Sequence, residues 1–390
     1  MSDWEWFHEV RQKAYQAKDT QRIRLIDLYY EGQGFSEKEP DRAIAIYEQA
    51  HALAEQLGEG WVMLAIDERH LRTLMYEKAN YLGALDLAVR ATVELRKPVY
   101  RRYPRRFMIP IYLVQIYRAL DARQYASDLK ALLDYLIVEV PEDDKETQYE
   151  LHSKRILFAM TMEEWDNALE LGLRYLALCG EDMAEAVRVY VLLCRVASNR
   201  REWKSVEEWA QAGAEGARQV NRMDILCECQ AWLAFLARRD NNEADAKRYY
   251  EEAIATAKSV GERPIFFYYN ILASFHVNGE EWEKASLVRQ HQIEHVGGTG
   301  QVMDELYYRV EHIKALGKLG QPIAEEHRAA RDLLGQVSNP APYDTELADL
   351  EKQYLSPPSP PLPPAAQAVS DGLEQVKKQV VRWIAGLFKG

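Results

Sequence analysis

The sequence predicts an all-α protein built from about eight helical hairpins, and two observations lead to that prediction. First, a residue pair three positions apart, often an aromatic followed by a small residue, recurs along the chain, as in Trp165 with Ala168 and Trp282 with Ala285. This spacing keeps both residues on the face of a helix that packs on a neighbour. Second, the recurrences are 38 to 44 residues apart over eight units, and so regular a period is typical of a helical repeat array. The second members of the pairs are Ala43, Ala84, Asp128, Ala168, Val206, Ala246, Ala285 and Ala324.

The helices can be placed in order from apolar periodicity and from the Gly, Asn, Asp and Pro residues between them. A first helix is expected from Ser2 or Asp3 to the break at Gly32 to Gly34, and a second, starting near Pro40, completes the first pair. Further pairs are expected at 61–76 with 81–95, 107–120 with 125–138, 146–160 with 163–178, 183–197 with 203–220, 223–237 with 242–260, 264–277 with 281–296, and 302–319 with 323–337. A short helix over 344–355 should cover the apolar end of the array, as terminal units require.

One unit carries a fuller motif, which runs through Tyr268, Asn270, Ile271, Phe275, Gly279, Trp282 and Ala285. In these residues, and in the ladders Ala43-Tyr47-Ala50, Ala84-Ala88-Ala91 and Ala246-Tyr250-Ala253, the chain resembles the tetratricopeptide repeats of the longer kind over about residues 3–337. Asp128 and Val206 depart from the family's pattern, which has Ala at those positions. The resemblance implies a right-handed α-α superhelical solenoid with a concave groove for peptides or helices, and it implies no chemistry.

Composition narrows the class of partner and the compartment. A net charge of −12 argues against nucleic-acid binding, because a protein that neutralises phosphates needs a basic face. Cys179, Cys194, Cys227 and Cys229 have no disulfide or zinc spacing, so we interpret them as reduced, small hydrophobic residues. The N-terminus lacks the features of a signal peptide, and no apolar run reaches the ~18 residues of a membrane span. A cytoplasmic location is therefore expected.

A cluster of cations stands out in this acidic chain at residues 97–106, where Lys97, Arg101, Arg102, Arg105 and Arg106 lie among Tyr100 and Tyr103. Arginine binds carboxylates and phosphates through two parallel hydrogen bonds, so the cluster suits an acidic peptide, a carboxylate terminus or a phosphate. The alternative is a solvated connector whose charges offset Glu142, Asp143 and Asp144. Further candidates for partner contacts, on the first helices of their pairs, are Arg188, Arg195, Tyr268 and Asn270.

Motifs for chemistry are few. His291-Gln292-Ile293-Glu294-His295 matches the pattern of the inverted zinc metallopeptidases, in which two His one turn apart share a metal. It lies on a predicted second helix, and the sequence offers no well-placed third ligand. The glycine-rich residues 297–300 lack the Lys-Ser/Thr ending of a phosphate loop and are interpreted as a turn or hinge. We therefore expect no catalytic residues, no bound metal and no cofactor.

The composition changes abruptly after residue 355. Residues 356–364 hold six prolines and predict an extended polyproline spacer or, alternatively, a ligand for a proline-reading domain. Residues 365–390 predict an amphipathic helix with the apolar stripe Val369, Leu373, Val376, Val380, Trp383, Ile384, Leu387 and Phe388. Such a mildly basic helix suits a membrane surface or a partner's groove, and the alternative is that it folds back on its own solenoid.

These observations divide the chain into a helical array at 1–355, a linker at 356–364 and a terminal helix at 365–390. The function they favour is a non-enzymatic adaptor that holds a protein or peptide in its groove and is localised by its tail, in the cytoplasm or at the periphery of a membrane. One alternative is a regulatory sensor whose solenoid changes conformation when a peptide or small ligand binds. Another is a cargo protein that is packaged through its terminal helix.

Overall fold

The chain is all-α over the residues that the computed structural model describes, which are 3–260, 266–337 and 340–355. These residues form eighteen α-helices, one π-turn and one short 3-10 turn, and no strand. The helices are α1 (Asp3–Ala17), α2 (Thr20–Phe35), α3 (Pro40–Leu57), α4 (Gly60–Arg72), α5 (Tyr81–Leu95), α6 (Met108–Asp121), α7 (Ala126–Glu139), α8 (Lys145–Thr161), α9 (Trp165–Cys179), α10 (Met183–Arg200), α11 (Trp203–Gln219), α12 (Met223–Arg239), α13 (Glu243–Ser259), α14 (Phe266–Asn278), α15 (Trp282–Val296), α16 (Val302–Lys318), α17 (Ala324–Leu334) and α18 (Ala341–Tyr354). The π-turn is η1 (Thr73–Glu77) and the 3-10 turn is η2 (Pro98–Tyr100).

The linker and the amphipathic helix expected after residue 355 lie outside the described residues, and so does their apolar stripe. Of the eighteen described helices, none has the length and apolar character needed to cross a lipid bilayer.

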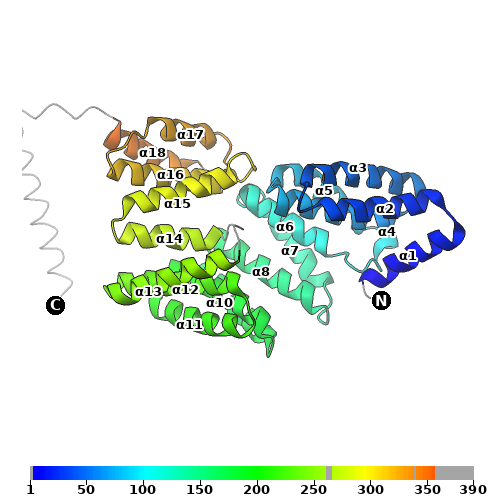
Figure 1. Ribbon diagram of the computed structural model, residues 1–390, viewed down its shortest axis with the longest axis horizontal. Coiled ribbons are helices and arrows are strands. Elements are labelled where there is room, and N and C mark those ends of the chain that lie inside the picture. Colours follow the sequence, from blue (N-terminus) through cyan, green and yellow to red (C-terminus); the bar gives the residue numbers. More distant parts are fainter. Residues whose placement is uncertain (1–2, 261–265, 338–339, 356–390) are drawn as a thin grey trace, which may run out of the picture.

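Helices pack mainly against their neighbours in the sequence, as Figure 1 shows, with α12 on α13, α10 on α11 and α2 on α3. From α4 to α14 the even-numbered helices also touch the next even-numbered helix, whereas the odd-numbered helices of the described chain approach one another less closely. In a curved stack the inner row is the more closely spaced one. The even-numbered helices therefore form the more closely spaced row of the array, which we call the inner row.

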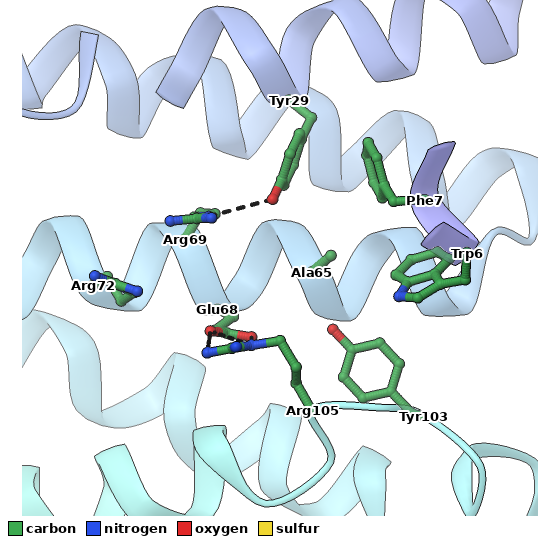
Figure 2. Close-up of a pocket in the computed structure, with 9 residues that line it drawn as sticks. All are labelled: Trp6, Phe7, Tyr29, Ala65, Glu68, Arg69, Arg72, Tyr103 and Arg105. Atoms are coloured by element: carbon green, nitrogen blue, oxygen red, sulfur yellow. Dashed lines mark hydrogen bonds and ion pairs between the residues drawn. The ribbon is translucent and has the colours of Figure 1, made fainter. Parts of the chain in front are cut away.

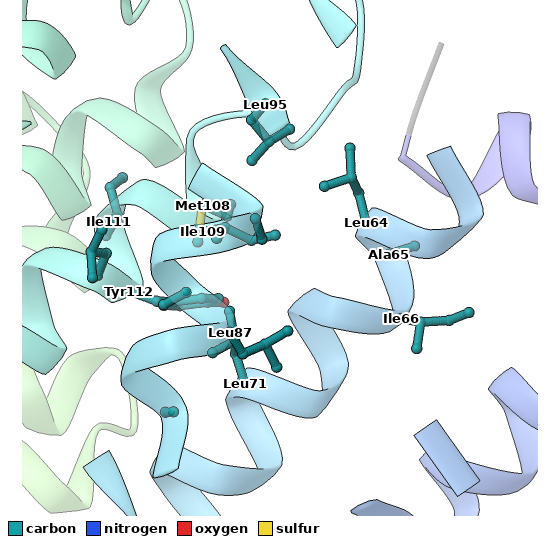
Figure 3. Close-up of a cluster of buried hydrophobic side chains, with 14 of the residues drawn as sticks. Leu64, Ala65, Ile66, Leu71, Leu87, Leu95, Met108, Ile109, Ile111 and Tyr112 are labelled. Carbon is teal, nitrogen blue, oxygen red and sulfur yellow. The ribbon is translucent and has the colours of Figure 1, made fainter. Parts of the chain in front are cut away.

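The small-residue ladders of the sequence lie inside the array. Ala43, Ala50 and Tyr47 of α3 are fully buried, and Ala84, Ala88, Ala246 and Ala253 are buried on α5 and α13. A methyl group at these positions lets two helix backbones approach closely while the large neighbour fills the remaining space. The core consists of several adjoining clusters, each shared by consecutive helices. Figure 3 shows the part contributed by Leu64, Leu71, Leu87, Ile109 and their neighbours on α4, α5 and α6.

The period of the sequence also appears in the backbone. Glu163, Arg201, Asn241, Glu280 and Gly320 all adopt left-handed φ angles of 60°, 60°, 59°, 55° and 65°. They lie 38 to 40 residues apart, and each stands shortly before the second helix of its pair. A left-handed residue costs about 1–2 kcal/mol unless it is glycine or, in some cases, asparagine, so tertiary packing of the two helices must enforce this turn at Glu163, Arg201 and Glu280.

Ion pairs join residues about one period apart and so connect consecutive pairs of helices. Examples are Arg22 with Glu59 at 2.6 Å, Arg105 with Glu68 at 2.8 Å, Arg188 with Glu150 at 2.9 Å, Arg195 with Glu228 at 2.7 Å and Arg238 with Glu281 at 2.9 Å. The four cysteines form no such links. All four are buried and free of disulfides, and burial raises the pKa of Cys227 to about 12.

The sequence predicted a single long first helix from residue 2 or 3 to a break at Gly32 to Gly34, and this prediction is wrong. The chain breaks at Lys18, which has a φ of 52°, and Asp19 then caps α2 by accepting a hydrogen bond from the backbone N–H of Arg22 at 3.0 Å. Gly32 and Gly34 do not interrupt α2, which continues to Phe35. Gly32 instead makes room for Tyr47, since a Cβ at Gly32 would stand 2.6 Å from the tyrosine ring.

The array curves far enough to bring distant units together. The connection between α15 and α16, residues 297–301, reaches the region of α5 and α6, where α16 also packs on α6 (Figure 1). A Cβ built on Gly300 would lie 3.1 Å from Cβ of Leu82 and 3.3 Å from Cδ2 of Leu120. We call this contact between residues 297–301 and the α5–α6 region the clasp.

The last helix covers the far end. α18 packs on α16 and α17 through Leu347 and Leu350, and the backbone of Gly317 leaves room for the ring of Tyr354. It begins a few residues before the expected start of 344, directly after Pro340.

Candidate functional site

The inner face of α4 and the π-turn that follows it carry the most distinctive group of side chains. Glu68, Arg69 and Arg72 lie on the last turns of α4, and Tyr76 lies in η1. Thr73 supports the turn, because its hydroxyl donates to the carbonyl oxygen of Arg69 at 3.1 Å and lies 2.7 Å from the hydroxyl of Ser36. A π-turn locally widens a helix and is frequent at functional sites.

A first cavity of about 120 Å³ opens beside α4 (Figure 2). Its aromatic walls are Trp6, Phe7, Tyr29 and Tyr103, and its charged residues are Glu68, Arg69, Arg72 and Arg105. Arg105 binds both carboxylate oxygens of the buried Glu68, with its Nε 3.0 and 2.9 Å from them. Nε of Arg69 donates to the hydroxyl of Tyr29 at 3.3 Å. The cavity thus combines aromatic walls with two arginines, Arg69 and Arg105, whose side chains are held in place by hydrogen bonds.

A second cavity, of about 740 Å³, shares Arg69 and Arg72 with the first. Its near wall comes from α2, α3, α4 and η1 and includes Tyr47, Met75 and Tyr76, and it extends to Tyr81 at the start of α5. Its far wall contains His295 and Gln301, which belong to α15 and to the clasp. The two cavities adjoin along α4, where they share two lining residues, and we refer to them together as the α4 groove.

The cation cluster at residues 97–106 is divided by the structure. Arg105 enters the α4 groove, whereas Arg106 pairs with Glu139 of α7 at 2.8 Å and packs over Phe107. Arg101 and Arg102 are exposed and line neither cavity of the groove. Among the described residues, the carboxylates seen to pair with Arg105 and Arg106 are Glu68 and Glu139 rather than the expected Glu142, Asp143 and Asp144.

Arg188 and Arg195 on α10 hold consecutive units together. Arg188 pairs with Glu150 of α8 and with Glu185, both at 2.9 Å. Arg195 binds Glu228 of α12 through two hydrogen bonds, at 2.9 and 2.7 Å, and the Glu228 carboxylate is buried. With their guanidinium groups so engaged, these two residues stabilise the array and are not brought into the α4 groove.

Tyr268 and Asn270 on α14 also make their contacts inside the array. Tyr268 is buried in the apolar cluster between α12, α13 and α14. The side-chain oxygen of Asn270 accepts hydrogen bonds from Nη1 of Arg289 at 2.5 Å and from Nε2 of Gln292 at 3.1 Å. The family-like position of Asn270 is therefore occupied by contacts within its own pair of helices.

The residues of the metallopeptidase-like motif lie on α15 and share no metal-binding arrangement. His291 packs edge-on against Tyr269, Glu294 accepts a hydrogen bond from Gln290, and His295 faces the second cavity. Within the described ranges no group of three or more His, Cys, Asp or Glu side chains could hold a metal ion.

Sequence reasoning missed Arg69, Arg72 and Tyr76. The available signal was two arginines three residues apart on the first helix of a pair, followed by an aromatic residue one turn later. The pattern itself does not distinguish a groove from a solvated face, and the residues of the far wall lie more than 200 residues away.

His70, beside the groove, makes the stability of α4 dependent on pH. Its ring stacks on Tyr47, with centroids 6.1 Å apart and planes at 28°. Burial, together with the positive charges of His51 and Arg90, lowers the pKa of His70 to about 4. An unfolded histidine titrates near 6.5. Between about pH 6.5 and 4, His70 is therefore protonated in the unfolded chain and neutral in the folded chain. Stability supplied by neutral His70 is therefore lost as the pH falls through that window.

We predict that His70→Gln removes about 3 kcal/mol of the acid-induced loss of stability between pH 7 and pH 4, because the pKa of His70 is about 4 in the folded chain and about 6.5 in the unfolded chain, and each pKa unit corresponds to about 1.36 kcal/mol. The free energy of urea unfolding, measured at several pH values for both proteins, tests this. His51, hydrogen-bonded to Asp67 at 2.6 Å, has a raised pKa and opposes the trend in both proteins alike. Parallel pH profiles of the two proteins would contradict the prediction.

Comparison of the chain with models of known protein families gives no match, and comparison with curated proteins gives none either. The assignment of the site therefore stands on the geometry described above.

Proposed function

We propose that the protein is a non-enzymatic adaptor: a right-handed solenoid of the tetratricopeptide kind, with about eight helical hairpins, whose inner face holds a peptide or protein segment. The observation that carries the proposal is the α4 groove, which lies on the inner row of helices and combines aromatic walls with three arginines. Apolar and aromatic walls with a few directed polar groups are typical of binding sites. Aromatic residues and arginine are also the side chains that dominate binding energy at interfaces.

Two regularities support the solenoid architecture. The left-handed residue before the second helix recurs every 38 to 40 residues from Glu163 to Gly320. Ion pairs such as Arg188 with Glu150 connect each unit to the next at about the same separation in sequence. In an array of this type each unit packs chiefly on its neighbours, and the curvature creates an extended concave binding surface.

The sequence of the tail, residues 356–390, adds a means of localisation to the proposed adaptor. Its apolar stripe from Val369 to Phe388 would dock on a membrane surface or on a partner helix, and the proline-rich residues 356–364 would space it from the array. Packaging of the protein through the same helix is the alternative role of the tail.

A regulatory sensor is the second candidate function, and the clasp favours it. Residues 297–301 contribute the far wall of the second cavity, through Gln301, while Gly300 lies against Leu82 and Leu120. A ligand that binds the closed arrangement better than the open one would shift the array toward closure.

The adaptor proposal is tested by selecting peptides from a random library on the full-length chain. Enriched peptides should bind the wild type and lose about tenfold or more in affinity with Tyr76→Ala, because Tyr76 lines the groove and is 51% exposed. Tyr15→Ala is the matched control, since Tyr15 is 48% exposed on α1 and lines neither cavity. The absence of any enriched peptide, or equal binding to both variants, would count against the proposal.

A further inference from the structure

Arg72 is a charged group of the α4 groove that has no partner among the described residues. It is exposed, it lines both cavities, and among the described residues no hydrogen bond or ion pair reaches its guanidinium. Its neighbours differ, since Arg105 binds Glu68 and Arg69 donates to Tyr29 (Figure 2). The chain has 61 acidic residues against 49 basic ones, so a shortage of carboxylates does not explain an unpaired arginine.

The wall of the second cavity contains a second unsatisfied polar group. Tyr47 is fully buried, and its hydroxyl makes no hydrogen bond of good geometry within the described part of the chain, although the hydroxyls of Thr73 and Ser36 lie close to it. The nearby hydroxyls of Ser36 and Thr73 lie 2.7 Å from each other. A buried hydroxyl without a partner costs about 1–3 kcal/mol, and in a native structure it calls for an explanation such as a ligand or an ordered water.

The charge in the second cavity favours an anion. Lys38, Arg69 and Arg72 face the space together with Glu37 and Glu77, which leaves one net positive charge in a chain whose net charge is −12. A guanidinium with free N–H groups binds a carboxylate or phosphate through two parallel hydrogen bonds. The half-exposed ring of Tyr76 adds an apolar edge beside it.

We propose that the second cavity is a binding site for an anionic group, a carboxylate or a phosphate, seated on Arg72 and enclosed by the clasp. The inference rests on the proposed function, to which it adds the charge of the ligand. The occupant contacts α4 and η1 on one side and His295 and Gln301 on the other, and it therefore joins two parts of the chain more than 200 residues apart.

The test uses the full-length chain and three probes: inorganic phosphate, acetylated hexaglutamate and, as the uncharged control, acetylated hexaglutamine. Binding is measured by titration calorimetry at low and at physiological salt. We expect hexaglutamate, phosphate or both to bind, and hexaglutamine not to bind. Binding of hexaglutamate alone identifies a peptide carboxylate as the ligand chemistry, and binding of phosphate alone identifies a phosphate group.

Arg72→Met should lower the affinity for the probe that binds by tenfold or more. Arg102→Met should leave that affinity unchanged, because Arg102 is exposed outside both cavities. Tyr47→Phe should weaken binding several-fold without lowering the thermal stability of the free protein, since it removes a hydroxyl that makes no hydrogen bond of good geometry. A structural role of that hydroxyl would instead lower the stability. Failure of both anions to bind, or equal binding by Arg72→Met and wild type, would overturn the inference.

The clasp is tested by a pair of glycines. Gly298 and Gly300 both have positive φ angles, of 75° and 87°, so alanine brings similar backbone strain at each. Only at Gly300 does the added Cβ meet Leu82 and Leu120, while at Gly298 it meets nothing within 4 Å. Gly300→Ala should therefore weaken anion binding more than Gly298→Ala does, and equal effects would refute the enclosure by the clasp.

The inference and the proposed function can fail separately. If selected peptides bind through Tyr76 but carry no acidic residues and bind Arg72→Met unchanged, the adaptor function stands and the anion site is refuted. If no peptide is selected while phosphate binds in an Arg72-dependent manner, the anion site stands and the peptide-binding function is refuted.

Discussion

Replacing Arg195 by methionine is expected to lower the unfolding free energy by about 3–5 kcal/mol, because it leaves the Glu228 carboxylate buried without its partner. Arg195 and Glu228 are 13% and 3% exposed, and two hydrogen bonds join them between α10 and α12. Methionine keeps much of the length of the arginine stem, so the change removes mainly the charge. The urea midpoint and the unfolding free energy of the full-length chain measure the loss.

Two comparisons make this prediction specific. Asp86→Ala breaks an exposed pair, in which Arg90 and Asp86 are 63% and 85% exposed, and it should change stability by no more than about 0.5 kcal/mol. The double change of Arg195 to Met and Glu228 to Leu should recover most of the loss, because it removes the stranded charge. A loss below about 1 kcal/mol for Arg195→Met would show that water reaches Glu228.

The pH dependence of the Arg195→Met variant gives an independent check. Burial already raises the pKa of Glu228 from its ordinary value of 4.5, and removal of the guanidinium raises it further. A carboxyl whose folded pKa is raised is destabilising when ionised and becomes harmless when protonated. The difference between variant and wild type should therefore shrink as the pH falls from 7 toward 5.

The second large effect is expected at Gly32. In Gly32→Ala the new Cβ would stand 2.6 Å from Cε1 and 2.9 Å from Cδ1 of Tyr47, whose ring is fully buried. Overpacking of this kind costs about 1–3 kcal/mol. It should also displace the wall of the second cavity. The measurements are the urea midpoint and, with the anionic probes, the change in binding.

Gly34→Ala, two residues further along α2, is the matched control for the stability measurement. A Cβ at Gly34 meets nothing within 4 Å, and the residue is helical. Alanine is favoured over glycine in a helix by up to about 1 kcal/mol, so this variant should be neutral or more stable than wild type. We expect the changes in unfolding free energy for Gly32→Ala and Gly34→Ala to have opposite signs. A Gly32→Ala variant that is more stable than wild type would show that Tyr47 can move aside.

The all-α character and the positions of the helices followed from the sequence. Helical periodicity is a property of residues three and four apart, so local spacing predicted the helices at 163–178 and 203–220 within a few residues of α9 and α11. The buried ladder of Ala43, Tyr47 and Ala50 was predictable for the same reason. The prediction of one continuous helix from residue 3 to residue 32 was wrong because Lys18 adopts a left-handed backbone conformation, which its residue type does not predict.

The functional candidates were predicted less well, because an arginine in a helical pattern has the same appearance whether it faces a groove or a carboxylate. Arg195, Arg188 and Arg106 found acidic partners about one period away, whereas Arg72 did not. Partner choice depends on how consecutive units are rotated against each other. That rotation is a tertiary quantity, and the spacing of residues within a helix does not report it.

By itself the sequence determined the period, the helix pairs, the small-residue faces and the composition of the tail. The tertiary structure alone decided the clasp, the second cavity and the isolation of Arg72. The physical reason is that helix formation and hairpin packing are short-range, whereas the curvature of an array is the sum of small rotations between many units. Only that sum brings Gly300 to Leu82 and Gln301 to the same cavity as Tyr47.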